Sequence, residues 1–237
     1  MKNNTLSLIV PTYNERNNLL ALVQRIHKAC AAHDIQEEIL VIDDNSPDGT
    51  AKYAEELAET YPVRVLLRTG KRGLSSAVVD GIVLAQNDIV GVIDADLSHP
   101  PEAIPHLLRL LDENEIVVGS RYVGGGGVEE WTLIRKVISK GATILAYPLT
   151  KIQDPMSGYF FFHKKLLDGK ELKPKGYKIL LEIIVKSGAQ KIAEFPYTFQ
   201  NRVLGSSKLG STQFFDYLLQ IADLYFYCLW KKLNIHF

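Results

Sequence analysis

The stretch DIVGVIDADLSHP, residues 88–100, decides the fold. It joins an apolar, β-branched run to two aspartates, Asp94 and Asp96, which are separated by one small residue. The run is too continuously apolar for a half-exposed strand and is typical of a buried parallel strand. We therefore expect a strand over residues 88–94 that leads into an acidic loop.

Similar apolar runs and helical patterns alternate along the first half of the chain. The runs that predict strands are residues 7–10, 38–43, 63–67 and 115–120. The helical patterns between them cover residues 17–31, 48–60, 74–86 and 101–113. This alternation predicts an α/β fold with a doubly wound, mostly parallel sheet flanked by helices. The less regular second half predicts helices and strands over residues 131–147, 154–162, 177–187, 192–199 and 212–231.

The composition describes a globular chain of 237 residues, of which 46% are hydrophobic. Lysine plus arginine (27) equals aspartate plus glutamate (27), which argues against a general nucleic-acid-binding protein. The two cysteines form no spacing motif, so we expect neither a disulfide scaffold nor a cysteine-built zinc site. Cys30 shares a helical stripe with Leu19, Val23 and Ile26, which predicts a buried, reduced thiol. The first residues lack the apolar stretch of a signal peptide, and we expect a cytoplasmic protein.

Polar and glycine-rich loops follow all five predicted strands. Their sequences are PTYNE (11–15), DDNSPDG (43–49), RTGKRG (68–73), DADLSHP (94–100) and GSRYVGGGG (119–127). The carboxyl ends of the strands are where an open α/β sheet binds its ligand. The loops therefore predict a binding site, and a nucleotide is the usual occupant.

Asp94 and Asp96 are the candidate metal ligands. Alternation along a strand would put both side chains on one side, where they can hold a hard divalent cation. Such a cation would bridge the phosphates of a nucleotide, although an acidic turn is the alternative interpretation. Ser98 lies two residues further, where a third oxygen comes either from its hydroxyl or from water. We do not expect a histidine ligand, so His99 is interpreted as a loop residue.

Acidic residues after the first two strands are candidates for the nucleoside site. We expect Asp44 to accept hydrogen bonds from a base or ribose, while Asp43 caps the turn NSPDG. Glu15 is either a helix N-cap carboxylate or a contact to the base, and its position leaves both interpretations open.

Seven motifs carry a resemblance to a known family. They are PTYNE, DDNSPDGT, KRGLSSAVVDG, DADLSHPP, VGSRYVGGGGVEEW, DPMSG and NRVLGSSKLG. Together they resemble the family-2 glycosyltransferases with a GT-A fold, and more narrowly those that make polyprenyl-phosphate mannose. The resemblance implies one GT-A domain over residues 1–237. Its parts are a nucleotide-sugar-binding half (1–127), an acceptor half (128–210) and a C-terminal amphipathic helix (211–237).

The resemblance also implies an activity and a set of site residues. The activity is inverting transfer of mannose from GDP-mannose to dolichyl or polyprenyl phosphate with Mg²⁺ or Mn²⁺. The catalytic residues carried over by position are Asp96, Arg121, Arg202 and Lys208. The same four residues also bind the donor, together with Pro11, Tyr13, Glu15, Ile42, Asp44, Asp94 and Ala95. The residues for the acceptor phosphate are Arg121, Arg135 and Ser139, and those for the metal are Asp94, Asp96 and Ser98. Ser98 departs from the pattern, because some relatives place a metal-binding glutamine there.

The expected acceptor makes a general base unnecessary. A phosphate monoester has a second pKa of about 6 and is mostly dianionic at neutral pH. We therefore expect Asp154 to orient the cationic cluster, or merely to cap the turn DPMSG. The alternatives are a polyprenyl-phosphate glycosyltransferase that uses UDP-glucose or another nucleotide sugar, a sugar-nucleotide pyrophosphorylase, and an inactive scaffold subunit. The second would need a glycine-rich loop where PTYNE has no glycine.

The pattern over residues 212–231 predicts a helix with a narrow polar stripe. The stripe consists of Gln213, Asp216, Gln220, Asp223, Tyr227 and Lys231. Two interpretations stay open: a helix in the membrane interface with Trp230, Lys231 and Lys232 at headgroup level, or a core or dimer helix. A lipid acceptor favours peripheral contact with the cytosolic face of a membrane. Some relatives continue into transmembrane helices, so a membrane-anchoring partner protein is a further expectation.

Overall fold

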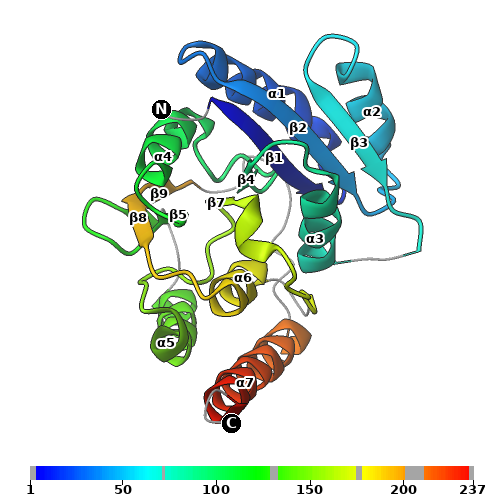
Figure 1. The fold of residues 1–237 in the computed structure, drawn as a ribbon. Coiled ribbons are helices and arrows are strands. Elements are labelled where there is room, and N and C mark those ends of the chain that lie inside the picture. The colour runs from blue at the N-terminus through cyan, green and yellow to red at the C-terminus, as the bar shows by residue number, and fades with distance from the viewer. Residues whose placement is uncertain (1–3, 71–72, 129–132, 175–177, 201–210, 235–237) are drawn as a thin grey trace.

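A seven-stranded sheet runs through the molecule in the order β3-β2-β1-β4-β7-β5-β8 (Figure 1). The computed structural model describes residues 4–70, 73–128, 133–174, 178–200 and 211–234. The first six strands are β1 (Thr5–Thr12), β2 (Gln36–Asp43), β3 (Val63–Leu67), β4 (Ile89–Val92), β5 (Ile116–Ser120) and β6 (Gly127–Val128). The last three are β7 (Phe160–His163), β8 (Ile192–Pro196) and β9 (Thr198–Phe199).

Most strand pairs are parallel, as the sequence predicts. β1 pairs in parallel with β2 and β4, β2 with β3, and β5 with β8. β7 lies antiparallel between β4 and β5 and joins the two groups into one sheet. β6 and β9 form a separate two-stranded parallel pair. The parallel arrangement brings the carboxyl ends of β1, β2, β3 and β4 to one edge, where the predicted loops lie.

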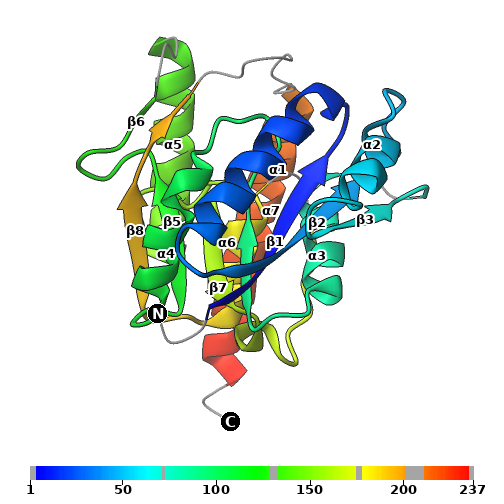
Figure 2. The same ribbon diagram turned by 90° about the horizontal axis from the view of Figure 1, so that it is seen from above.

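Helices cover both faces of the sheet (Figures 1 and 2). The helices are α1 (Arg16–Ala31), α2 (Thr50–Leu57), α3 (Leu74–Leu84), α4 (Ile104–Leu111), α5 (Leu133–Thr150), α6 (Ile179–Ser187) and α7 (Ser211–Asn234), with 3₁₀ turns η1 (Pro101–Ala103) and η2 (Lys164–Leu167). α1, α2 and α4 share one core with the sheet, and α3 and α6 share the core on its other face. α5 and α7 pack with α6 in a third, smaller cluster. The layers explain why the strands are apolar on both sides.

The buried thiol of Cys30 confirms the expectation from its helical stripe. Cys30 has no exposed surface and lies in the core with Leu19, Val23 and Ile26. Burial raises the pKa of this thiol to about 12, with a smaller contribution from Glu37. The thiol is therefore a core group.

The strand that carries the acidic motif is shorter than the sequence predicts. β4 ends at Val92, so Asp94 and Asp96 lie in the loop that follows. The alternation argument for these two side chains is therefore wrong, because it applies only within an extended strand. A left-handed residue, Leu97 with φ of 61°, turns the chain directly after Asp96. The loop and not the strand sets the directions of the two carboxylates.

α7 confirms the predicted terminal helix but not the uniform polar stripe. Gln220 is buried, and its Nε2 donates a hydrogen bond to the carbonyl oxygen of Lys178 at 3.1 Å. Asp216 and Asp223 are exposed, as a solvent-facing stripe requires. Part of the polar stripe is therefore buried against the domain and part faces solvent, because α7 is docked through Tyr217, Ile221 and Leu224. Among the helices that the structure describes, none combines the length and apolar character that spanning a membrane requires.

Candidate active site

The loop after β4 forms the centre of the candidate site. Asp96 is 4% exposed, and its Oδ1 accepts hydrogen bonds from the Ser98 hydroxyl at 2.5 Å and the Ser98 backbone N–H at 3.1 Å. The carbonyl of Ser98 accepts a hydrogen bond from the N–H of Gln200 at 3.2 Å, which ties the loop to the end of β9. The Asp96 carboxylate is therefore held in one orientation.

Asp94 lies more openly than Asp96 and rests against a glycine of the DPMSG turn. Its side chain is 29% exposed. A Cβ placed on Gly158 would lie 2.6 Å from Asp94 Oδ2 and 3.0 Å from its Cγ, both shorter than an ordinary contact. A larger residue at position 158 would therefore displace the Asp94 carboxylate.

His99 is a loop residue, as expected, but no local pattern predicts its burial. The imidazole is 1% exposed. Its ring centroid lies 5.3 Å, 5.4 Å and 5.7 Å from those of Tyr159, Tyr197 and Phe199. Burial lowers the pKa of His99 to about 4; the charge of Asp96 opposes this shift and that of Arg121 adds to it. The imidazole is therefore neutral near pH 7.

Arg121 is paired with Asp154 across the site. Nε and Nη2 of the guanidinium donate to the two carboxylate oxygens at 2.7 Å each, and the Arg121 N–H adds a third bond at 3.0 Å. Burial opposes the charge of Arg121, but the hydrogen bonds to Asp154 outweigh it and the pKa of the guanidinium is raised. The expected contact between Asp154 and the cationic cluster is confirmed.

Glu194 on β8 holds the turn that carries Asp154. Its two carboxylate oxygens accept hydrogen bonds from the N–H groups of Gln153 (2.7 Å) and Asp154 (2.9 Å). Sequence reasoning missed this residue, because a glutamate in a half-buried strand has no local signal for such a contact. Glu194 thereby holds the backbone of Asp154 in place, so that its carboxylate can reach Arg121.

Arg135 and Ser139, two of the three residues predicted for the acceptor phosphate, lie on α5. The Ser139 hydroxyl is 2.6 Å from the hydroxyl of Tyr122, the neighbour of Arg121. This contact places Ser139 next to the Arg121 loop, as its expected role requires. The side chain of Arg135 lies outside the described part of the chain, as do Arg202 and Lys208.

The predicted nucleoside residues gather at the ends of β1 and β2. Pro11 and Ile42 are partners in the register of these parallel strands. Asp43 accepts hydrogen bonds from the N–H (2.8 Å) and the hydroxyl (2.6 Å) of Ser46, which confirms its role as a turn cap. Tyr13 is half-buried at the start of the loop after β1.

Glu15 does not act as the N-cap carboxylate that one of its two interpretations predicts. It occupies the N-cap position of α1, but its side chain makes no hydrogen bond to the helix backbone. Its Oε2 instead accepts a hydrogen bond from the Asn18 side chain at 2.8 Å. The contact to a base stays a prediction.

Asp44 is bound to an arginine that sequence reasoning missed. Its Oδ1 accepts from Arg68 Nη1 at 2.6 Å, and its Oδ2 accepts from the Gly73 N–H at 2.7 Å. The Arg68 side chain is 3% exposed and also contacts Asp80 at 3.0 Å. A charged residue directly after a buried strand was the available signal. The cluster fixes Asp44 directly after the carboxyl end of β2.

The donor set suits a hard divalent cation that shares its coordination with a ligand. Asp94 and Asp96 offer carboxylate oxygens, with Ala95 buried between them. Within the described ranges, no group of three or more His, Cys, Asp or Glu side chains could hold a metal ion. Mg²⁺ typically uses one or two carboxylates and completes its shell with water and phosphate oxygens. The two aspartates fit this pattern.

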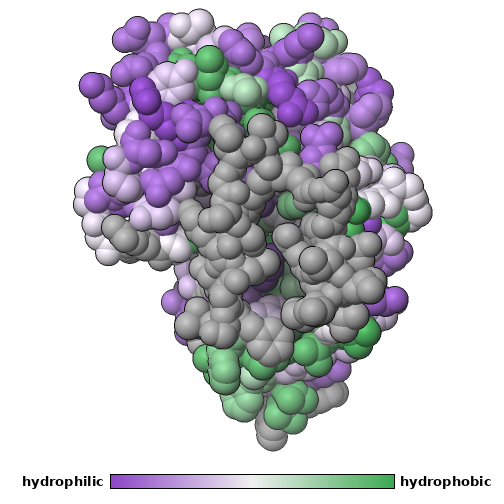
Figure 3. All heavy atoms as spheres, turned by 180° about the vertical axis from the view of Figure 1, so that it is seen from behind, coloured by the Kyte–Doolittle hydropathy of each residue, from purple (hydrophilic) through white to green (hydrophobic). Residues whose placement is uncertain are grey.

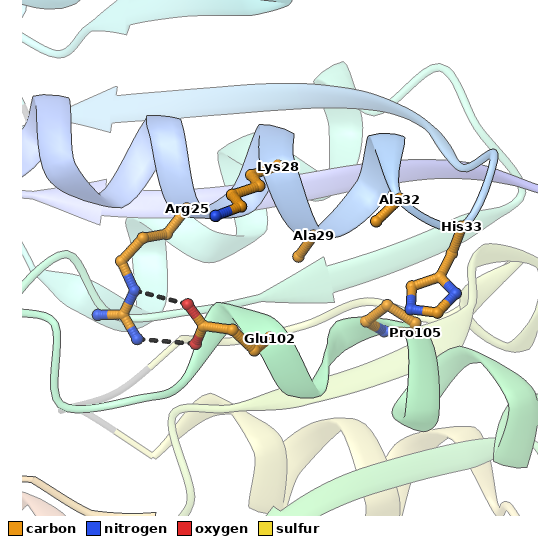
Figure 4. Close-up of a pocket in the computed structure, with 7 residues that line it drawn as sticks. All are labelled: Arg25, Lys28, Ala29, Ala32, His33, Glu102 and Pro105. Carbon is orange, nitrogen blue, oxygen red and sulfur yellow. Dashed lines mark hydrogen bonds and ion pairs between the residues drawn. The ribbon is translucent and has the colours of Figure 1, made fainter.

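A surface pocket of about 260 Å³ lies away from these loops, at the carboxyl end of α1 (Figure 4). Arg25 on α1 and Glu102 on η1 form a two-point ion pair across it, with distances of 2.8 Å and 2.7 Å. His33 lies at its other end, where the chain turns toward the amino end of β2. The pocket contains none of the predicted site residues.

The sheet and its covering helices have the architecture of a GT-A fold, and comparisons with known proteins agree. Residues 7–169 match the family described as Glycosyl transferase family 2, and the chain belongs to this family. The chain also resembles a solved glucosyl-3-phosphoglycerate synthase from Mycobacterium tuberculosis in complex with Mn²⁺, UDP and glucosyl-3-phosphoglycerate. That likeness has a TM-score of 0.66 at 19% identity and covers 94% of this chain and 79% of the other, so it shows the fold.

Two curated relatives are more similar in sequence, and both are named dolichol-phosphate mannosyltransferase. One, from Pyrococcus furiosus, is 48% identical over 92% of this chain. The other, from Mycosarcoma maydis, is 44% identical over 92% of this chain and 78% of its own length. The chain spans 63% of the length of the Pyrococcus relative. The expected family is confirmed.

Proposed function

We propose that the chain transfers mannose from GDP-mannose to a dolichyl or polyprenyl phosphate, with inversion at the anomeric carbon and with Mg²⁺ or Mn²⁺. The observation that carries this proposal is the loop of Asp94 and Asp96, in which Ser98 orients the Asp96 carboxylate. Arg121 supports it as a buried cation whose orientation is set by its hydrogen bonds to Asp154. The names of the relatives support the sugar and the acceptor. The Mn²⁺ and UDP in the glucosyl-3-phosphoglycerate synthase support a divalent cation.

Asp94 and Asp96 are the residues that would hold the cation. When bound there, it would neutralise charge on the departing diphosphate. The Ser98 bonds keep the Asp96 carboxylate directed, so little reorganisation is needed when the donor binds. At the nucleoside edge, Asp44 and Ile42 would contact the base and ribose, with Pro11, Tyr13 and Glu15 on the neighbouring loop.

The residues of the acceptor side suit a phosphate acceptor, which needs cations, better than a hydroxyl acceptor, which needs a general base to remove its proton. A phosphate monoester is mostly dianionic at neutral pH, so its oxygen can attack the anomeric carbon as the bond to the diphosphate breaks. Asp154 uses both carboxylate oxygens to bind Arg121, which suits orientation and not proton removal. Arg121, Arg135 and Ser139 would steer the phosphate, and Arg202 and Lys208 stay predictions for charge compensation.

A second part of the proposal is that α7 rests on a membrane surface. α7 leaves large apolar side chains exposed on the face opposite its docked face: Phe215, Leu219, Phe226, Leu229, Trp230 and Leu233. Ile144, Leu145 and Tyr147 of the neighbouring helix α5 are also exposed. Figure 3 shows hydrophobic side chains gathered at the end of the molecule where α7 lies. A lipid acceptor gives this face a function, and a membrane-anchoring partner protein stays a prediction.

Vesicle co-sedimentation tests the membrane contact. We expect the protein to pellet with vesicles of phosphatidylcholine and phosphatidylserine, and the variant Phe226→Asp/Trp230→Asp to stay in the supernatant. The control is Val83→Asp on α3, which places a charge at an apolar side chain of similar exposure (75%) on another part of the surface. Equal sedimentation of all three proteins would exclude the α7 face as the contact.

A donor panel tests the reaction. Purified protein is incubated with Mg²⁺ or Mn²⁺, a short polyprenyl phosphate, and separately GDP-mannose, UDP-glucose or UDP-N-acetylglucosamine, and mass spectrometry identifies the lipid product. We expect a mannosylated polyprenyl phosphate from GDP-mannose, and no such product with EDTA. Product from a UDP-sugar alone would keep the mechanism and replace the donor. Calorimetry with GDP then distinguishes an intact site without acceptor from an inactive scaffold if no product forms.

A further inference from the structure

We propose that Ser98 is a positioning residue for Asp96 and not a ligand of the cation, so that water fills the coordination position next to it. This inference rests on the metal-dependent function proposed above. It is argued from the hydrogen bonds of the loop after β4.

Both hydrogen-bond donors of Ser98 are directed at one oxygen of Asp96. The hydroxyl lies 2.5 Å from Asp96 Oδ1, and the backbone N–H lies 3.1 Å from the same oxygen. A serine hydroxyl carries a single hydrogen, and an ionised carboxylate can only accept. The hydrogen of Ser98 is therefore committed to Asp96.

The other side of the Ser98 hydroxyl is turned toward His99. Ser98 Oγ lies 3.3 Å from His99 Nδ1. Because the Ser98 hydrogen is used on Asp96, the Nδ1–H of His99 is the donor in this contact. The result is a chain of hydrogen bonds that runs from His99 through Ser98 to Asp96.

Packing fixes this chain and encloses the Ser98 oxygen. Ser98 has no exposed surface, and the His99 ring is enclosed by Tyr159, Tyr197 and Phe199. An oxygen that donates to Asp96, accepts from His99 and is shielded from solvent is poorly placed to enter the shell of a cation. Groups that orient metal ligands in this way contribute to metal affinity without touching the metal.

The test counts water molecules on bound Mn²⁺ in the presence of GDP. Water-proton relaxation gives the number of coordinated waters and the Mn²⁺ affinity for the wild type and Ser98→Ala. GDP affinity is measured separately without metal. The control is Ser75→Ala on α3, where the serine is equally buried and its hydroxyl has no hydrogen-bond partner in the described part of the chain.

We expect Ser98→Ala to keep the number of waters on Mn²⁺ while the Mn²⁺ affinity falls about tenfold. GDP affinity without metal should not change, and Ser75→Ala should match the wild type in all three measurements. One additional water on Mn²⁺ in Ser98→Ala would show that the hydroxyl is a ligand and would overturn this inference alone. Failure of the wild type to bind Mn²⁺ with GDP would overturn the metal-dependent function and this inference together.

Discussion

The guanidinium of Arg121 lies edge-on against the carboxylate of Asp154, with both N···O distances at 2.7 Å. The Arg121 side chain is 9% exposed and that of Asp154 is fully buried. Arg121 Cζ also lies 5.3 Å and 5.8 Å from the ring centroids of Tyr122 and Phe199. A planar fork held on one edge and stacked on its faces has a single orientation. The pair carries no net charge, and it holds the guanidinium of Arg121 in that one orientation.

Removing one member of this pair should cost more stability than removing both. Asp154→Ala leaves the Arg121 charge buried without its partner, which destabilises the fold by about 3–5 kcal/mol. The double variant Arg121→Met/Asp154→Leu replaces the pair by apolar side chains and should recover most of that loss. Urea denaturation measures the free energy of unfolding of each protein.

Activity should follow a different order from stability in the same variants. We expect the double variant to stay inactive, because the phosphate loses its cation, while Asp154→Asn keeps part of the wild-type rate since it retains one acceptor for Arg121. Activity in the double variant would show that Arg121 has no role in the reaction.

Asp96→Ala should abolish turnover while leaving the fold intact. The change removes one of the two carboxylates that would hold the cation, namely the one that Ser98 orients. Product formation at saturating Mn²⁺ is the measurement. Asp168→Ala, at an exposed aspartate after η2, is the control and should retain the wild-type rate. Turnover close to normal in Asp96→Ala would refute the metal assignment.

Gly158→Ala should impair the site through Asp94. The new methyl group would lie 2.6 Å from Asp94 Oδ2, so the carboxylate must move. We expect Mn²⁺ affinity in the presence of GDP to fall by about tenfold or more. Gly141→Ala on α5, where a Cβ meets no atom within 4 Å, is the matched control and should bind Mn²⁺ normally. Normal Mn²⁺ affinity in Gly158→Ala would show that the close approach has no functional consequence.

Arg68→Met should destabilise the nucleoside edge. The variant leaves Asp44 and Asp80 close together without the cation that both contact, at a cost of about 3 kcal/mol in the free energy of unfolding. Calorimetry should also show weaker GDP binding, because Asp44 loses its fixed position. Arg109→Met, at an exposed arginine of α4, serves as the control. GDP binding at wild-type strength in Arg68→Met would separate Asp44 from the nucleotide.

Stability should fall as the pH is lowered from 6.5 toward 4. His99 has an ordinary pKa of 6.5 and a folded-state pKa of about 4, because it is buried. Between these values the unfolded chain binds a proton at His99 that the folded chain does not, so stability rises with pH through this window and is constant above it. The contribution reaches about 3 kcal/mol. Thermal melts between pH 4 and 7 should show a flatter profile for His99→Gln, and identical profiles would contradict the assignment.

Much of the fold follows from local patterns in the chain. The strand over Val63–Leu67 has the predicted bounds, and α1, α3 and α6 begin and end within two residues of expectation. These elements are well predicted because each has a buried face whose period appears directly in the sequence. β4 ends two residues earlier than predicted, because its apolar run continues past Val92 into a loop that is itself buried. α2 and α4 are also shorter than the predicted helices.

The sequence by itself determined the family, the parallel sheet, the acidic loop and the polar loops that follow the strands, because motifs and hydrophobic periods are local. Only the tertiary structure decided which groups are partners. Arg68 with Asp44, Arg121 with Asp154, Glu194 with the turn at Asp154, and His99 with its aromatic rings all join segments far apart in the chain. A buried charge or polar group needs a partner of matching geometry, and packing of the whole sheet selects that partner.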